Sequence, residues 1–138
     1  KEQIDVTDYL ESTITLFKDY LDEKQLQLSN EITESIVVNA NAFLIETLIH
    51  NLLSNAIRHT PKGGQIIVSY QQTSFQVRNS GKESLDKSRL FERFSTTTKD
   101  KVSSGLGLAI IKEIAKIYGW KLTYNFESNF HVFSVSLE

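Results

Sequence analysis

Asn51-Leu52-Leu53-Ser54-Asn55-Ala56 is the stretch that decides how this sequence is interpreted. It lies in a predicted helix over 41–59, with Asn41 as its N-cap. The apolar face of that helix is formed by Ile45, Ile49, Leu52, Leu53, Ala56 and Ile57. At about 100° per residue, Asn51, Asn55 and Arg58 share one narrow polar stripe. Asparagine is a mediocre helix former, and its neutral oxygen suits Mg²⁺ that is held together with phosphates. By itself, this helix favours the alternative of an ordinary polar flank.

A second segment, Gly105-Leu106-Gly107-Leu108-Ala109-Ile110, changes that balance. Its glycines let the backbone approach a ligand closely, and the first N–H groups of the helix that follows attract anions. Lys99 and Lys101 precede it and either reach phosphate oxygens or are solvated surface lysines. A lone Gly-x-Gly is weak evidence, but the two segments together predict a nucleotide site.

The remaining elements predict an α+β fold. We expect helices over 8–23, with Thr7 as N-cap, and over 106–118, with Gly119 after its end. Strands are predicted over 26–32, 66–70, 75–78, 120–126 and 132–137, and a short apolar run lies at 36–38. Few connections look parallel, so the order favours a mixed sheet with all helices on one side over a doubly wound fold. The polar stretch of about 80–104 is long for so small a domain, which is typical of a lid.

Composition restricts the classes of function. The chain has 138 residues, the size of a single domain, and a formal net charge of -2, which argues against nucleic-acid binding. It contains no apolar run of membrane-spanning length, so we expect no membrane contact by this fragment. It has no cysteine, hence no thiolate zinc site and no thiol nucleophile. Methionine is absent even at position 1, so we interpret the chain as a fragment of a longer protein.

Four segments of the chain resemble the N, G1, F and G2 boxes of sensor histidine kinases. They are Asn51 to His59, Asn79 to Gly81, Leu90 to Phe94 and Gly105 to Ile110. The resemblance is to the catalytic and ATP-binding domain and covers nearly the whole chain. It implies a two-layer α/β sandwich with a mixed, mostly antiparallel sheet, about three helices on one face and an ATP lid over about 80–104. This fold is shared with DNA gyrase, a heat-shock chaperone and mismatch-repair ATPases.

The same resemblance implies roles for individual residues. Asn55 would bind Mg²⁺, and Asn51 would lie beside the phosphates, so these two are the candidate catalytic residues. The other residues expected to bind ATP are Arg58, His59, Asn79, Gly81, Lys99, Gly105, Leu106, Gly107 and Leu108. The ATPase relatives carry a glutamate general base at the position of Asn51, and an amide cannot do that work. The resemblance therefore favours phosphoryl transfer to a side chain over hydrolysis.

Two positions depart from the G1 box, which is usually Asp-x-Gly-x-Gly. Asn79 replaces the acid that accepts the adenine amino group, and Glu83 replaces the second glycine. Asn79 can still accept through its carbonyl oxygen, but hydrogen bonds to a charged group are typically stronger by about 1 kcal/mol. We expect weak ATP binding, and both loss of binding and an altered base preference remain open. If binding is lost, the alternative function is a nucleotide-free docking module.

The chain also lacks the expected phosphoacceptor, a histidine followed by an acidic residue. His50, His59 and His131 are followed by Asn51, Thr60 and Val132. The acceptor is therefore expected on a dimerising helical hairpin of the same parent protein, preceding Lys1. The resemblance further implies a response regulator as partner and the cytoplasmic part of a membrane-anchored sensor as location. A protein-serine kinase of the anti-sigma-factor type, which shares the boxes, is the other alternative.

Overall fold

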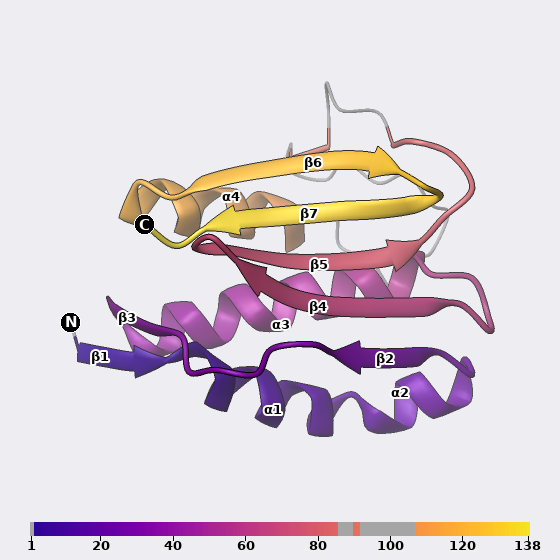
Figure 1. The fold of residues 1–138 in the computed structure, drawn as a ribbon, viewed down its shortest axis with the longest axis horizontal. Helices are drawn as coiled ribbons and strands as arrows, with labels where there is room; N and C mark the ends of the chain where they lie inside the picture. The colour runs from indigo at the N-terminus through magenta and orange to yellow at the C-terminus, as the bar shows by residue number, and fades with distance from the viewer. Residues whose placement is uncertain (1, 86–89, 92–106) are drawn as a thin grey trace.

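A five-stranded sheet forms one layer of the molecule (Figure 1). The structure is a computed structural model, and it describes residues 2–85, 90–91 and 107–138. In spatial order the strands are β2 (Gln27–Asn30), β4 (Gln65–Gln71), β5 (Ser74–Ser80), β7 (Phe130–Ser136) and β6 (Lys121–Glu127). β2 and β4 pair in parallel and the other neighbours are antiparallel. The predicted mixed, mostly antiparallel sheet is confirmed.

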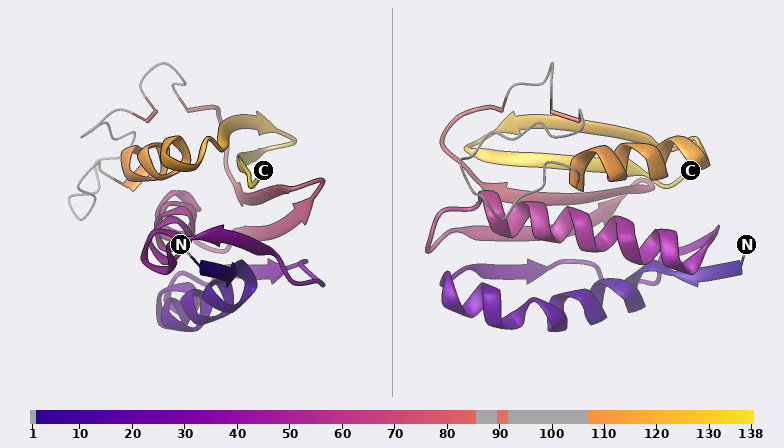
Figure 2. Two further views of the ribbon diagram at one scale, coloured as in Figure 1. Left: turned by 90° about the vertical axis from the view of Figure 1, so that its left-hand side faces the viewer. Right: turned by 180° about the vertical axis from the view of Figure 1, so that it is seen from behind.

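The helices form the second layer and all lie on one face of this sheet, as Figure 2 shows. They are α1 (Val6–Leu16), α2 (Lys18–Glu23), α3 (Ala42–His59) and α4 (Gly107–Tyr118). The sheet buries alternate residues of β5, namely Phe75, Val77 and Asn79, and α3 packs against this strand. The core therefore lies between the two layers, as expected for an α/β sandwich. Within the described ranges, no helix is both long and apolar enough to cross a membrane.

The N-terminal helix begins and divides differently from its prediction. Its N-cap is Asp5, not Thr7, and an Asp5 carboxylate oxygen accepts from the Thr7 N–H at 3.0 Å and from the Thr7 hydroxyl at 2.6 Å. These hydrogen bonds to Thr7, led by the one from its hydroxyl, hold the pKa of Asp5 below its ordinary value. The predicted helix over 8–23 is also two helices, because Phe17 leaves the helical conformation between α1 and α2.

The central helix α3 agrees closely with its prediction. Asn41 caps it, accepting from the Leu44 N–H at 3.1 Å, and the helix ends at His59. Its predicted apolar face is buried throughout: Ile45, Ile49, Leu52, Leu53, Ala56 and Ile57. A helix whose apolar residues recur at this spacing buries one continuous face, which is why its boundaries were predictable.

Both long hairpins also follow their predictions. Gln72 and Thr73 join β4 to β5, and Ser128 and Asn129 join β6 to β7, with positive φ angles at all four positions. Two consecutive positive φ values are typical of the tight turn that matches strand twist. Gly119 ends α4 at φ +70°, as expected for the residue after a helix.

A two-stranded ribbon is the element that the sequence pattern did not predict. β1 (Glu2–Asp5) pairs antiparallel with β3 (Val37–Ala40), with Ile4 opposite Val38. Both of these residues are buried. β1 is only four residues long and leads directly into α1, so no period-two pattern can develop within it.

Candidate functional site

The predicted site residues that the structure describes gather at the C-terminal half of α3, the end of β5 and the start of α4. Ser80, the last residue of β5, is bound to the first residue of β4, because its Oγ accepts from the N–H of Gln65, directly after the turn that follows α3, at 2.9 Å. A Cβ on Gly64 in this turn would meet Thr60 Cγ2 at 2.5 Å and Ser80 Oγ at 3.3 Å. The end of α3 and the end of β5 therefore both approach this turn.

The start of α4 is brought to α3 by its first glycine. A Cβ on Gly107 would lie 3.2 Å from Asn51 Oδ1, closer than most side chains tolerate. The other end of α4 contacts the start of α3, since Tyr118 Oη accepts from the Asn41 N–H at 2.9 Å. The two helices are thus antiparallel neighbours. This arrangement places the glycine of the second sequence motif against the first asparagine of the first motif.

Asn51 is held in one orientation by its own helix. Its Nδ2 donates to the Thr47 carbonyl at 2.8 Å, which directs Oδ1 towards Gly107. The side chain is half-buried. An amide fixed by such a bond presents an acceptor to whatever lies at the start of α4, and it carries no group able to serve as a general base.

Asn55 is almost completely buried, with 1% of its surface exposed, one turn after Asn51. Its Oδ1 has no hydrogen-bond partner among the described residues. Leaving a buried acceptor unpaired costs about 1–3 kcal/mol, so native proteins rarely do so without a reason such as a bound ion. Asn55 is therefore not part of an ordinary polar flank, the alternative that the helix pattern by itself favoured.

Asn79 has the same property on the sheet. It is 0% exposed, and its Oδ1 is also unpaired within the described part of the chain. Its Nδ2 donates to the Ser80 carbonyl over 3.5 Å, a distance at which a hydrogen bond contributes little. Two buried acceptors without partners, one on α3 and one on β5, therefore belong to the same layer interface.

The segment after Asn79 is tied to the β6–β7 hairpin. The Gly81 N–H donates to the Asn129 carbonyl at 2.9 Å, and a Cβ on Gly81 would collide with the imidazole of His131. This close approach gives a physical reason for glycine at the predicted position. Glu83, which stands where the family pattern has glycine, is exposed.

The C-terminal turn of α3 carries Arg58 and His59, both half-buried. Lys24, at the end of α2, donates from Nζ to the Ile57 carbonyl at 2.7 Å and to the Arg58 carbonyl at 3.2 Å. A cation at this end of a helix satisfies its last carbonyls and opposes the helix dipole. Lys24 was not among the predicted site residues, because no local pattern links residues this far apart.

Several predicted residues lie outside the described part of the chain: Lys99, Lys101, Gly105 and Leu106, together with most of the predicted lid and the end of the Leu90 to Phe94 segment. Leu90 is buried, Phe91 is half-buried, and Leu108 packs partly buried against the core.

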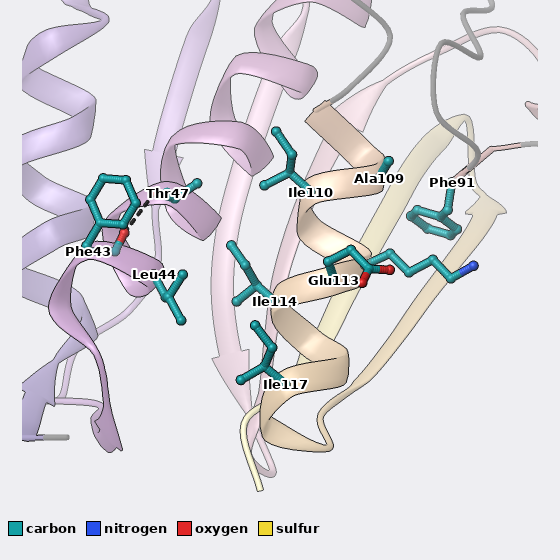
Figure 3. Close-up of a pocket in the computed structure, with 10 residues that line it drawn as sticks. Phe43, Leu44, Thr47, Phe91, Ala109, Ile110, Glu113, Ile114 and Ile117 are labelled. Carbon is teal, nitrogen blue, oxygen red and sulfur yellow. Dashed lines mark hydrogen bonds between the residues drawn. The ribbon is translucent and has the colours of Figure 1, made fainter.

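An apolar groove of about 700 Å³ lies beside the site, not within it. Figure 3 shows Phe43 and Leu44 of α3 across from Ile110, Ile114 and Ile117 of α4. The other lining residues are Thr47, Phe91, Ala109, Lys112 and Glu113. The groove follows the first half of α3, and among the described residues none of those predicted to bind nucleotide lines it.

Comparison with known proteins identifies a family and relatives that this chain resembles. Residues 40–137 match the family described as histidine kinase-, DNA gyrase B-, and HSP90-like ATPases. The sensor histidine kinase HprS of Escherichia coli strain K12 is 31% identical over 99% of this chain, which spans 30% of that relative's length.

Solved structures of histidine kinases share the fold. The mycobacterial sensor histidine kinase MprB superposes with a TM-score of 0.80 at 19% identity, over 97% of this chain and 95% of that one. The histidine kinase ThkA, crystallised in complex with the response regulator protein TrrA, superposes with a TM-score of 0.78 at 25% identity. That match covers 96% of this chain and 40% of the ThkA chain.

Proposed function

The chain belongs to the histidine kinase-, DNA gyrase B- and HSP90-like ATPases, as an ATP-binding catalytic domain of the two-component sensor kinase type, and from this premise we propose its reaction. We propose that it binds ATP together with Mg²⁺ and transfers the γ-phosphoryl group to a histidine on a separate module. The observation that carries the proposal is the pair of buried, unpaired acceptors, Asn55 Oδ1 and Asn79 Oδ1.

Asn55 fits the metal. Among the described residues, no three His, Asp or Glu side chains gather to hold a metal ion by themselves. Mg²⁺ is commonly bound through one or two protein oxygens together with substrate phosphates and water, and the buried Asn55 Oδ1 supplies such an oxygen. When bound there, Mg²⁺ would neutralise phosphate charge and orient the γ-phosphoryl group.

Asn79 fits the base. Its unpaired Oδ1 is an acceptor of the kind that an exocyclic adenine amino group requires. Gly81 lies against His131, and because it has no Cβ, no side chain fills the space beside the backbone at this position. We propose that these two residues form the base pocket and that Asn79 performs the recognition which the family assigns to an acid.

The phosphate region is proposed between α3 and the start of α4. Gly107 and Leu108 would present backbone N–H groups there, and Asn51 would lie beside the phosphates without activating water. Arg58 and His59 would contribute from the last turn of α3. Lys99, Gly105 and Leu106 complete the proposed set from outside the described residues.

The phosphoacceptor is proposed to lie on another module. None of the chain's histidines precedes an acidic residue, and His131 is buried at 5% exposure, where it cannot meet a phosphate donor. We propose a dimerising helical hairpin of the same parent protein as the acceptor and a response regulator as the next recipient. We further propose that residues 1–138 form one catalytic unit that works in the cytoplasm.

Isothermal titration tests the proposal. The chain is titrated with a non-hydrolysable ATP analogue, with and without Mg²⁺, and Asn55→Ala is compared with Asn125→Ala, a change at an exposed position of β6. We expect Mg²⁺-dependent binding by the wild type and by Asn125→Ala, and loss of that dependence in Asn55→Ala with the melting temperature maintained.

Flat heats in the wild type, together with a melting temperature that ATP and Mg²⁺ do not raise, would overturn the kinase proposal. That result would favour the nucleotide-free docking module, because a ligand that binds only the native state must stabilise it. Unchanged binding by Asn55→Ala would overturn only the metal assignment.

A further inference from the structure

A buried pair of side chains, Tyr124 of β6 and His131 of β7, lies behind the proposed base pocket. Tyr124 Oη and His131 Nδ1 are 2.7 Å apart, and the two residues are 6% and 5% exposed. Phe126 and Phe133 surround them with aromatic rings, at 5.1 Å from His131 and 4.9 Å from Tyr124 between ring centroids. The proposed chemistry gives neither polar group a function.

Both members of the pair contact the segment that carries the pocket. Tyr124 Oη accepts from the Leu85 N–H at 3.0 Å, and the His131 imidazole fills the space that a side chain at Gly81 would need. His131 is also the direct cross-strand partner of Asn79. Two adjacent side chains therefore contact the segment at residues 81 and 85, and one of them belongs to the residue that pairs with Asn79 across the sheet.

Leu85, Tyr124 and His131 are linked by two consecutive hydrogen bonds. Tyr124 Oη accepts from the Leu85 N–H, and it can donate its own proton to His131 Nδ1 in the tautomer that carries the imidazole proton on Nε2. Burial lowers the pKa of His131 and so favours its neutral ring.

We propose that Tyr124 and His131 are positioning residues for the nucleotide base: they fix the segment 81–85 relative to Asn79. The inference rests on the proposed function and extends it to two residues that touch neither base nor phosphate. The Tyr124 hydroxyl anchors the far end of the segment, and the imidazole supports its start. Loosening either contact should weaken recognition of the base and leave the phosphate region unchanged.

The test uses two Tyr→Phe variants that remove matched hydrogen bonds. Tyr124→Phe deletes the acceptor for the Leu85 N–H, and Tyr118→Phe deletes the acceptor for the Asn41 N–H, a bond of nearly equal length at the far end of α4. Affinity is measured for an ATP analogue and for inorganic tripolyphosphate, which lacks the base. We expect Tyr124→Phe to weaken ATP binding about fivefold and Tyr118→Phe to leave it unchanged.

Tripolyphosphate separates positioning from general destabilisation. Its affinity should be the same in the wild type and in both variants, since only the base pocket is altered. If Tyr124→Phe does not fold, His131→Phe gives the second measurement, because it keeps an aromatic ring and removes the Nδ1 acceptor. In a double-mutant cycle the losses of ATP affinity caused by Tyr124→Phe and His131→Phe should be less than additive, as expected for residues that act as one unit.

Each outcome has a defined consequence. Equal ATP affinity in the wild type and Tyr124→Phe overturns the positioning inference and leaves the kinase proposal intact. Parallel losses for ATP and tripolyphosphate overturn it as well, because they indicate a structural effect on the whole site. A wild-type chain that binds no ATP overturns the proposed function and this inference with it.

Discussion

Replacing Asn79 by valine should make the nucleotide-free protein more stable while removing its response to ATP. Asn79 is 0% exposed, its Oδ1 is unpaired among the described residues, and the hydrogen bond from its Nδ2 to the Ser80 carbonyl spans 3.5 Å. Valine suits this position, because the neighbouring core-facing residues of β5 are Val77 and Phe75 and β-branched side chains pack well in strands. The perturbation therefore removes a polar mismatch without changing the fold.

The magnitude of the Asn79→Val effect follows from the unpaired acceptor. Burying such a group costs about 1–3 kcal/mol, so the free energy of unfolding should rise by about that amount. At roughly 3 °C per kcal/mol for a domain of this size, the melting temperature should rise by about 3–9 °C. Saturation with ATP and Mg²⁺ at about 100 times Kd should stabilise the wild type by about 2.7 kcal/mol and the variant hardly at all.

Urea unfolding and thermal melts, each with and without ATP and Mg²⁺, measure both effects of Asn79→Val. Gln76→Val on the opposite face of β5 is the matched control for strand propensity, and we expect its stability to change by less than about 1 kcal/mol. A melting temperature of Asn79→Val below that of the wild type, in the absence of ligand, would refute the reasoning. It would mean that Oδ1 has a partner in solution and that the pocket holds no unpaired acceptor for the base.

Three further predictions test other parts of the site. Gly107→Ala should lower ATP affinity several-fold in titrations, because the new Cβ must displace the Asn51 carboxamide 3.2 Å away. The melting temperature should not fall, because alanine favours the helix more than glycine does. Lys24→Met should lower the free energy of unfolding in urea by about 1–2 kcal/mol, since the carbonyls of Ile57 and Arg58 lose their donor; no change would show that water replaces the ammonium. The pKa of His131 is lowered in the folded state, so the unfolded chain binds the extra proton more readily, and the free energy of unfolding should fall as the pH drops below about 6.5. Urea melts at pH 7.5 and 5.5 measure this fall, and it should be smaller in a His131→Gln variant.

The elements predicted correctly are those specified by local chemistry. Asn41 starts α3 because its side chain accepts from an N–H three residues later, and Gly119 ends α4 because it adopts a positive φ. The apolar period of α3 identified its buried face before any contact was known. Such signals lie within one or two turns of chain, where single-sequence reasoning is strongest.

The features that were missed depend on contacts between distant residues. The bonds from Lys24 to the end of α3 cross more than thirty positions, and the bond between Leu85 and Tyr124 joins residues 39 positions apart. His131 was considered in the sequence as a possible phosphoacceptor, and its register opposite Asn79 is set by the β5–β7 pairing. The N-cap was placed at Thr7, since both Asp5 and Thr7 are good caps and the β1–β3 ribbon decides between them.

The amide at position 79 is consistent with the burial of that position. A carboxylate at 0% exposure loses its hydration, which raises its pKa and lowers the stability of the empty site. A neutral amide avoids the charge penalty, while its unpaired Oδ1 remains an acceptor for an amino group. The bond from Nδ2 to the Ser80 carbonyl favours the orientation in which Oδ1 accepts, the one we expect to suit adenine, but at 3.5 Å it restrains the amide only weakly. Weak binding with a preference for ATP over GTP is therefore the behaviour that this side chain's chemistry supports.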